Sequence, residues 1–459
     1  MTTARKVFLA LLVLDTLSVV AVFNAVSLFR GLLGGGHLIL LPLLAPLLAM
    51  VFAIYLIDGY RPRTDMLSLD YTSLHSIALL SAMVATLLTT FVLLPQGYEL
   101  KSSRTVIALS FIVLIPFTLS YRRIVYQRVA ERRGNRAIVF VGNDASCLDF
   151  RQECERMRST QSVIFSVVGS APSVAPAPES VDQLRPLSEV LDEVRAGKLS
   201  VEAIVQRESG RDLPLEISQK LVELYFRGVP TYTLELFHEV YWRKIPLYRL
   251  NQTWLFQEGF QMAREPVFQR LKRTVDIVLA SVGLLLAAPL ITLGALAHWL
   301  ENGRPVFFKQ NRIGKDNVPF PLLKLRTMRL GADSQSDPYT RPNDSRVTRV
   351  GRFLRATRID EFPQLWNVLR GDMSLIGPRA EWDRLVVSYN REIPCYYFRH
   401  LVKPGITGWA QVNYPYGANI EDTRRKLEYD LYYIRHFSFV LDASIVLKTI
   451  HVMLFGKGR

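Results

Sequence analysis

The sequence predicts a membrane protein with an N-terminal α-helical bundle, a central α/β domain and an α-rich C-terminal domain that carries a re-entrant membrane hairpin. Three observations predict this class: long apolar stretches in the first third, alternating strand and helix patterns in the middle, and arginine-rich segments in the last third. The chain of 459 residues is too long for one ordinary core. We therefore expect domains at about residues 1–130, 131–255 and 256–459.

Four apolar stretches in the first domain predict membrane helices, because each is close to the ~20 residues that cross a bilayer. They lie at about residues 7–28, 38–57, 72–94 and 106–126. Basic residues precede the first stretch and follow the second and fourth. The positive-inside rule therefore predicts that the N-terminus and everything after residue 130 are cytoplasmic. The alternative is a buried helical bundle in a soluble protein.

A fifth apolar stretch occupies residues 274–300, and basic residues flank it on both sides. Both of its ends are therefore expected to stay in the cytoplasm. Pro289 lies near its middle, where proline removes a backbone hydrogen bond and breaks or kinks a helix. These features predict a re-entrant helix–break–helix at about residues 272–300, with the break at Pro289. The alternative is a true crossing.

The central region alternates predicted strands, such as "RAIVFVGND", "SVIFSVVGS" and "VEAIVQ", with helical stretches. This alternation predicts a small Rossmann-like parallel α/β unit. Only Gly142 follows the first strand, so the dinucleotide fingerprint G-x-G-x-x-G is absent. We expect a structural or dimerising role rather than nucleotide sensing.

The stretch "RIDEFPQLWNVLRGDMSLIGPRA" (358–380) places two adjacent carboxylates, Asp360 and Glu361, among arginines. Pro363 suits the first turn of a helix, so Asp360 is a candidate N-cap with Glu361 in the first turn. The same place suits phosphate chemistry. An ionised Asp can attack phosphorus, a neighbouring Glu can hold Mg²⁺, and arginines can neutralise the transferred group. Arg355 and Arg358 are the arginines expected to turn inward.

Four segments in the last third, "KLRTM", "RIDEFPQLWNVLRGDMSLIGPR", "VKPGITGWAQV" and "YDLYYIRHFSFVLD", resemble the bacterial sugar transferase family. These enzymes are polyprenyl-phosphate hexose-1-phosphate transferases, and the resemblance covers about residues 268–459. The helices and Rossmann-like domain ahead of it are similar to those of the large monotopic phosphoglycosyl transferases. The C-terminal "NYPYGANIEDTRRKLEYDLYYI" resembles an exosortase-linked, exopolysaccharide-initiating subgroup.

The resemblance implies that Asp360 attacks the β-phosphate of a UDP-sugar, releases UMP, and passes the phosphosugar to undecaprenyl phosphate. Glu361, with Asp360, would hold Mg²⁺. The residues expected to bind phosphate are Arg355, Arg379, Arg358, Lys324 and Arg326. Asp430 matches an acidic position of the family. A bacterial inner membrane location, a cytoplasmic catalytic domain, contact with membrane lipids and a homodimer are further expectations.

The chain departs from the usual family pattern at two places. Ala380 follows Arg379 where a second proline is common, and "NYPYG" follows "GWAQV" where relatives often have Asn-Gly-Arg-Asn. Arg424 or Arg425 is a candidate substitute for the missing arginine. Both departures concern the recognition of nucleotide and sugar.

Two other classes of function stay open at this point. A membrane glycosyltransferase would use Asp360 as a base, move the sugar alone and release UDP. A non-enzymatic scaffold, with the α/β unit sensing a nucleotide, would work without Asp360. The basic charge of +15 also suits nucleic acid, but the chain has no recognisable nucleic-acid-binding module, so we expect no nucleic acid partner.

Overall fold

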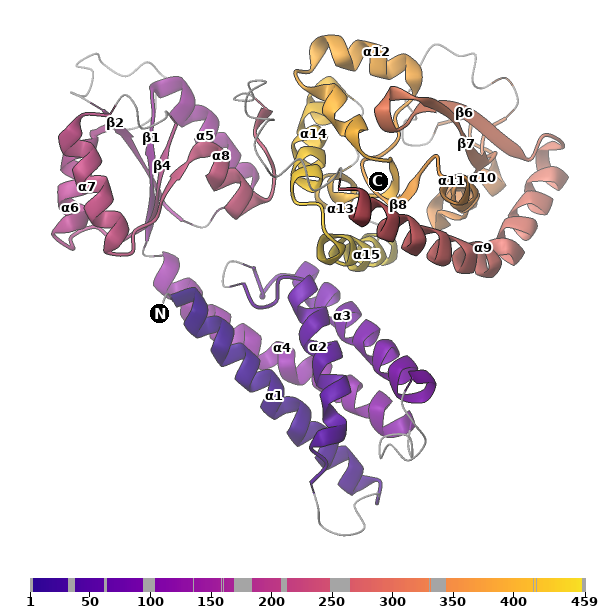
Figure 1. The fold of residues 1–459 in the computed structure, drawn as a ribbon, viewed down its shortest axis with the longest axis horizontal. Helices are drawn as coiled ribbons and strands as arrows, with labels where there is room; N and C mark the ends of the chain where they lie inside the picture. Colours follow the sequence, from indigo (N-terminus) through magenta and orange to yellow (C-terminus); the bar gives the residue numbers. More distant parts are fainter. Residues whose placement is uncertain are drawn as a thin grey trace. The chain divides into compact units, whose positions relative to one another are not determined.

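A computed structural model describes most of the chain (Figure 1). The described residues are 3–31, 38–61, 64–93, 104–134, 136–157, 159, 161–168, 184–207, 213–247, 265–329, 331, 344–415, 417 and 419–455. Contacts divide the chain into two compact units, residues 1–242 and 243–459. The three domains predicted from the sequence stay a prediction, and each unit is described by itself.

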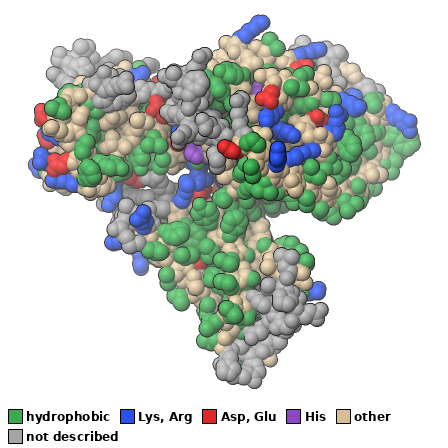
Figure 2. Space-filling model, in the orientation of Figure 1, with side chains coloured by type: hydrophobic (Ala, Val, Ile, Leu, Met, Phe, Trp, Pro, Cys, Tyr) green, Lys and Arg blue, Asp and Glu red, His purple; other side chains and the backbone are tan. Residues whose placement is uncertain are grey.

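Apolar helices form the N-terminal part, as the sequence predicts. The helices are α1 (Thr3–Phe29), α2 (Leu44–Leu56), α3 (Leu69–Leu88) and α4 (Arg104–Gly134). By length and composition, segments 5–29, 69–92 and 104–131 can each cross a membrane. The second apolar helix is shorter than the predicted 38–57, because residues 38–40 are not helical and residues 41–43 form a 3₁₀ turn; Asp58, with a left-handed backbone (φ 61°), follows its C-terminal end. Figure 2 shows apolar side chains over much of the visible face of this bundle, which is typical of a membrane protein.

A buried polar cluster joins α1 and α4 to the turn that follows α2. Asp15 of α1 and Arg122 of α4 form an ion pair of 2.6 Å, and neither side chain is exposed. Tyr60, just beyond α2, and Tyr121 donate hydrogen bonds to the two carboxylate oxygens of Asp15. Both carboxylate oxygens of Asp15 therefore have partners, whereas Nε and Nη1 of Arg122 have no hydrogen-bond partner among the described residues, and this guanidinium lies over the rings of Tyr60 and Tyr121. We call these four residues the bundle clasp.

The central region is a parallel five-stranded sheet, in the order β3-β2-β1-β4-β5. The strands are β1 (Ala137–Val141), β2 (Val163–Val167), β3 (Arg185–Pro186), β4 (Val201–Gln206) and β5 (Thr231–Thr233). The helices are α5 (Asp144–Arg156), α6 (Leu187–Arg195), α7 (Leu215–Phe226) and α8 (Leu234–Phe237).

The sheet has a helical layer on each face, which explains why its central strand β1 is apolar and buried at every position. Ile138 and Phe140 pack against α5 and α8, whereas Val139 and Val141 pack against α6 and α7 (Figure 1). The parallel sheet confirms the α/β prediction for this region.

The second unit begins with α9 (Pro266–Asn302), which contains Pro289. It is one helix of 37 residues rather than two separate ones, and a straight helix of that length would extend about 55 Å. Figure 1 shows instead that it bends part-way along, as an internal proline favours. The predicted interruption is therefore a bend within a continuous helix.

Both arms of α9 are attached to the same compact unit. Lys272 forms an ion pair of 2.5 Å with Asp442, near the start of the helix. At its far end, Glu301 accepts hydrogen bonds from the backbone N–H groups of Arg349 and Val350. Between these attachments α9 exposes large apolar side chains. They include Val278, Leu285, Leu286, Leu293 and Leu300.

Small strand pairs and short helices complete this unit. An antiparallel pair is formed by β6 (Phe307–Ile313) and β7 (Pro319–Leu325), and a parallel pair by β8 (Ser374–Ile376) and β9 (Gly405–Thr407). The helices are α10 (Arg349–Thr357), α11 (Gln364–Arg370), α12 (Asp383–Glu392), α13 (Trp409–Asn413), α14 (Ile420–Arg435) and α15 (Phe439–Leu454). Its main core is aromatic, with Trp409, Tyr396 and Tyr433 almost fully buried.

Candidate active site

The two adjacent carboxylates lie in a sharp connection between α10 and α11. Arg358 ends α10 in the left-handed conformation (φ 58°), and a 3₁₀ turn, η12 (Ile359–Glu361), follows. The N-cap position of α11 is occupied by Pro363, not by Asp360. The predicted capping role of Asp360 is therefore wrong. The 3₁₀ turn separates this residue from the helix and turns its side chain into the protein.

Asp360 is buried, with 7% of its surface exposed, and its Oδ1 atom has no hydrogen-bond partner among the described residues. Burial, with a smaller contribution from the neighbouring Glu361, raises the pKa of Asp360 from its usual 3.8 to about 6. The positive charges of Lys324, Arg355 and Arg358 limit this rise. The carboxylate is thus ionised above pH 6. Its pKa is higher than it would be at a helix N-terminus, where the ionised form would be stabilised.

Glu361 faces three cations. Its Oε1 atom lies 3.2 Å from Lys324 Nζ and 3.5 Å from Arg379 Nη2, and its Oε2 atom lies 3.7 Å from Arg358 Nη1. Burial alone would raise the pKa of Glu361, but these cations outweigh it and lower the pKa to about 2. The pKa of Lys324 is lowered, mainly by burial. The adjacent carboxylates therefore have pKa values shifted in opposite directions.

The other predicted phosphate-binding residues separate into two groups. Arg355 donates through Nε to the Thr327 hydroxyl (2.8 Å), and its charge lowers the pKa of Asp360. Arg326 points elsewhere: it donates to the Pro305 carbonyl and lies over the ring of Phe308. Alternation along a continuing strand would place Lys324 and Arg326 on the same face, but β7 ends at Leu325, so Arg326 lies beyond the strand and does not follow its alternation.

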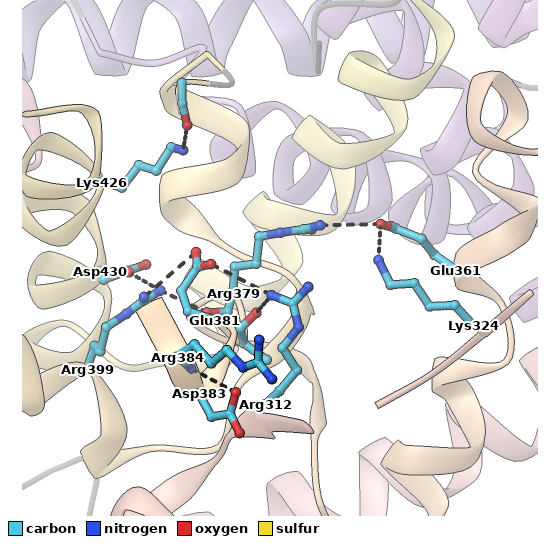
Figure 3. A network of polar contacts seen from close by, with 12 residues as sticks. Arg312, Lys324, Glu361, Arg379, Glu381, Asp383, Arg384, Arg399, Lys426 and Asp430 are labelled. Atoms are coloured by element: carbon cyan, nitrogen blue, oxygen red, sulfur yellow. Dashed lines mark hydrogen bonds and ion pairs between the residues drawn. The ribbon is translucent and has the colours of Figure 1, made fainter. Parts of the chain in front are cut away.

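Asp430 lies in a second polar cluster (Figure 3). It is 2% exposed, and its Oδ2 atom lies 2.9 Å from Arg399 Nη2. Arg399 and Arg312 both lie within 4 Å of Glu381. Burial raises the pKa of Asp430 to about 6, although Arg399 opposes the rise. The sequence did not indicate Arg312, Glu381 or Arg399, since they become neighbours only in the folded chain.

The two candidate substitutes for the missing arginine form ion pairs on the surface of α14. Both Arg424 and Arg425 lie within 3.3 Å of Glu421, and Arg425 also approaches Glu428. These contacts do not bring either guanidinium to the carboxylate pair.

A small cleft lies beside Lys324 and Arg379, two of the cations that face Glu361. It encloses about 230 Å³, including space open to solvent. It is lined by Arg312, Leu322, Lys324, Gln364, Met373, Arg379, Ala380 and Gly405. Ala380 thus forms part of the cleft wall. The cleft has three cationic side chains, and this suits an anionic ligand.

Comparison with known proteins places this arrangement in a family. Residues 267–456 match the model of the family described as "Bacterial sugar transferase". The UDP-glucose:undecaprenyl-phosphate glucose-1-phosphate transferase of Caulobacter vibrioides is 45% identical over 185 residues, which are 40% of this chain and 69% of that protein. The chain belongs to the bacterial sugar transferase family.

Other relatives within the sugar transferase family match different shares of the chain. The UDP-N-acetylgalactosamine-undecaprenyl-phosphate N-acetylgalactosaminephosphotransferase of Aeromonas hydrophila is 39% identical over 269 residues, 59% of this chain and 63% of that protein. The UDP-glucose:undecaprenyl-phosphate glucose-1-phosphate transferase of Escherichia coli is 43% identical over 190 residues, 41% of each chain. The matches thus span less than two thirds of these two relatives.

The site's suitability for a metal can be tested on its donor atoms. The described residues contain no group of three or more His, Cys, Asp or Glu side chains arranged to hold a metal ion. Asp360 Oδ1, however, is a buried oxygen without a partner, and Glu361 lies next to it in sequence. Mg²⁺ often takes only one or two carboxylates and completes its shell with phosphate and water. The carboxylate pair therefore fits Mg²⁺ that arrives with a phosphate substrate.

Proposed function

We propose that this sugar transferase moves a hexose-1-phosphate from a UDP-sugar to undecaprenyl phosphate, with release of UMP. The relatives' names supply the substrate classes, since each names undecaprenyl phosphate and a UDP-sugar. The product, undecaprenyl-diphosphate-sugar, would begin the assembly of an exopolysaccharide, capsule or O-antigen. The observation that carries the proposal is the buried oxygen of Asp360, which has no hydrogen-bond partner within the described part of the chain, beside a cluster of cations.

The reaction proceeds in two displacements at one phosphorus atom. An Asp360 oxygen attacks the β-phosphorus, and the bond from that phosphorus to the oxygen bridging the two phosphates breaks, so UMP leaves. A phosphate oxygen of undecaprenyl phosphate then attacks the same phosphorus, and the bond to Asp360 breaks. The carboxylate is regenerated, and no external oxidant or base is consumed.

The pKa values of the two carboxylates suit different roles. A nucleophile must be ionised and only weakly solvated, and a pKa of about 6 leaves Asp360 mostly ionised at neutral pH. Glu361 stays charged down to about pH 2, because Lys324, Arg379 and Arg358 surround it. These three cations would turn to the phosphates when substrate enters, as charge-assisted hydrogen bonds to phosphate are strong.

Mg²⁺ would be held by Asp360 and Glu361 together with substrate phosphate. When bound it would neutralise charge on the diphosphate and orient the leaving group. Lys324 Nζ, 3.2 Å from Glu361, would then move toward phosphate, because it could not share that oxygen with a divalent cation.

The attachment of α9 supports its re-entry into one leaflet. Lys272 and Glu301 lie near opposite ends of the helix and both bind the same compact unit, so both ends belong on one side of the membrane. Gly294, beyond the bend, packs against Leu354 of α10 and Leu325 of β7. A re-entrant α9 would set the site at the cytoplasmic face of the bacterial inner membrane, where a lipid phosphate and a soluble nucleotide can meet.

Cysteine labelling tests this topology. Single cysteines at the exposed positions Val318 and Val440 would be reached by a membrane-impermeant reagent only from the cytoplasmic side. Labelling in intact cells would refute re-entry.

We also propose a homodimer, which crosslinking in native membranes would test.

The chemical step is tested with purified full-length protein, UDP-sugars labelled in the sugar or the β-phosphate, Mg²⁺ and undecaprenyl phosphate. UMP should be released, and denatured protein should retain label from either position. Asp360→Asn should abolish both, while the matched variant Asp192→Asn, at an exposed site on α6, should abolish neither. UDP as the product would establish a glycosyltransferase instead, and full activity of Asp360→Asn would exclude the nucleophile.

A further inference from the structure

The segment that carries Arg379 has no helix or extended strand of its own. Residues 377–381 follow β8 and precede α12, and their contacts there are a single bridge between Arg379 and Gly405 and individual hydrogen bonds. Its position therefore depends on what binds its backbone. Four consecutive carbonyl groups, from residue 378 to residue 381, each accept a hydrogen bond, and the donors belong to two segments, residues 312–313 of β6 and residues 399–405.

The outer two of these bonds come from backbone groups. Gly405 N–H donates to the Pro378 carbonyl (2.9 Å), and Ile313 N–H donates to the Glu381 carbonyl (3.1 Å). The inner two come from guanidinium groups. Arg399 Nη2 donates to the Arg379 carbonyl (2.9 Å) and Arg312 Nη1 to the Ala380 carbonyl (3.1 Å).

Arg399 is itself held from several directions. It is 5% exposed, its Nη2 atom lies 2.9 Å from Asp430 Oδ2, and its Nη1 atom donates to the Tyr396 hydroxyl (2.6 Å). A guanidinium has five N–H donors in a rigid plane, so it can hold several acceptors in a fixed relation. Asp430 thus orients the group that binds the Arg379 carbonyl.

Glu381 connects the two guanidinium groups. Its Oε1 atom lies 3.9 Å from Arg399 Nη1, and its Oε2 atom lies 3.8 Å from Arg312 Nη1. Figure 3 shows Arg399 and Glu381 on one side of Arg379, whose side chain extends the other way, toward Glu361 and Lys324. The backbone of Arg379 is therefore held on one side and its guanidinium is presented on the other.

We propose that Arg399, oriented by Asp430, is a positioning residue that aims Arg379 at Glu361 and the transferred phosphate. Arg312 and Glu381 complete this clamp at the next residue. The inference rests on the proposed function for its chemistry. It also gives Asp430 a role: this carboxylate acts through Arg399 and Arg379 rather than on the substrate. A displacement of about 1 Å at such a group can lower a rate by about 10²-fold.

The test compares Arg399→Lys and Asp430→Asn with the control Arg384→Lys. Arg384 is an exposed arginine on α12 that lies over Trp382. A lysine at 399 can keep the charge opposite Asp430, but one ammonium group cannot also hold the Arg379 carbonyl and the Tyr396 hydroxyl in place. We expect kcat for UMP release to fall about 10- to 100-fold in both clamp variants, with a smaller change in KM, and no change in the control.

A double-mutant cycle distinguishes positioning from general damage. If Arg399 acts through Arg379, Arg399→Lys should cost little further activity once Arg379→Met is present. The proposal would be overturned if the losses of activity caused by Arg399→Lys and Arg379→Met simply multiplied in the double variant. A wild-type kcat in both Arg399→Lys and Asp430→Asn would overturn it too. Thermal unfolding of each variant identifies any that fail to fold. If Arg399→Lys does not fold, Tyr396→Phe, which removes only the hydroxyl, takes its place in the cycle.

A measurement without substrate separates this inference from the proposed function. Amide hydrogen exchange of residues 377–381 should be faster in Arg399→Lys and unchanged in Arg384→Lys. Unchanged exchange in Arg399→Lys would refute the clamp whatever the reaction is. Absence of UMP release by the wild-type protein, with faster exchange in the variant, would refute only the proposed function.

Discussion

Asp360→Asn should make the protein more stable at neutral pH while it removes activity. Burial and the neighbouring Glu361 raise the pKa of Asp360 from 3.8 to about 6. A carboxyl whose pKa is higher in the folded state binds its proton more tightly there, so stability is lost as pH rises between these two values. The loss is complete above pH 6 and absent well below pH 3.8. A shift of about two units corresponds to about 3 kcal/mol at 1.36 kcal/mol per unit.

Thermal unfolding of the detergent-solubilised protein measures this effect. At pH 7.5, Asp360→Asn should raise the Tm of the C-terminal unit by several degrees, since ~1 kcal/mol is worth ~2–4 °C in a unit of this size. At pH 4 the difference should shrink to less than about 1 kcal/mol, because the native carboxyl is then protonated. Asp192→Asn, an exposed aspartate paired with Lys220, is the matched control and should show no such pH dependence.

Two results would refute the reasoning. One is a Tm for Asp360→Asn below that of the wild-type protein at pH 7.5. The other is a gain of equal size at both pH values, which would mean that the amide packs better and that ionisation is irrelevant. The expected outcome would show that the site maintains an unfavourable charge for function, a common conflict between stability and activity.

Three further changes have defined outcomes. Glu361→Gln should lower the Tm at pH 7.5 by an amount equivalent to up to about 3 kcal/mol, because the pKa of Glu361 in the folded protein is about 2. The ionised Glu361 stabilises the wild-type protein above pH 4.5, and this stabilisation should be lost only as the pH falls toward 2. A series of Tm measurements over this pH range checks the prediction. Gly351→Ala should lower the free energy of unfolding by about 3 kcal/mol, since its Cβ would lie 2.0 Å from the Thr327 carbonyl oxygen; unchanged unfolding would contradict this. Asp15→Leu should destabilise the helical bundle by about 3–5 kcal/mol, and adding Arg122→Met should restore most of the loss; additive losses would show that the two charges do not interact.

Much of the organisation could be predicted because it depends on local patterns. The apolar length of α1, α3 and α4 is a property of continuous sequence, and so is the strand–helix alternation that produces the central parallel sheet. The pair Asp360–Glu361 could be located for the same reason. Pro289 indicated a departure from a straight helix, and the structure shows it as a bend within α9.

The environment of the carboxylates could not be predicted from neighbouring residues. Asp360 was expected at a helix N-terminus, where backbone dipoles would favour its ionised form. It lies instead in a buried 3₁₀ turn, and burial raises its pKa. Arg326 was expected to bind phosphate alongside Lys324, but its guanidinium lies over Phe308. The exact end of β7 decides this, and a strand end is set by packing.

The sequence by itself determined which residues carry charge, where apolar segments are long enough for a membrane, and where two acids stand among arginines. Only the tertiary structure decided which cation meets which acid. Lys324 reaches Glu361 from strand β7, and Arg399 reaches the Arg379 carbonyl from the 3₁₀ turn Tyr396–Leu401. Burial and ion pairing set the pKa and the orientation of a carboxylate. Both arise only when segments that are distant in sequence pack together and exclude water.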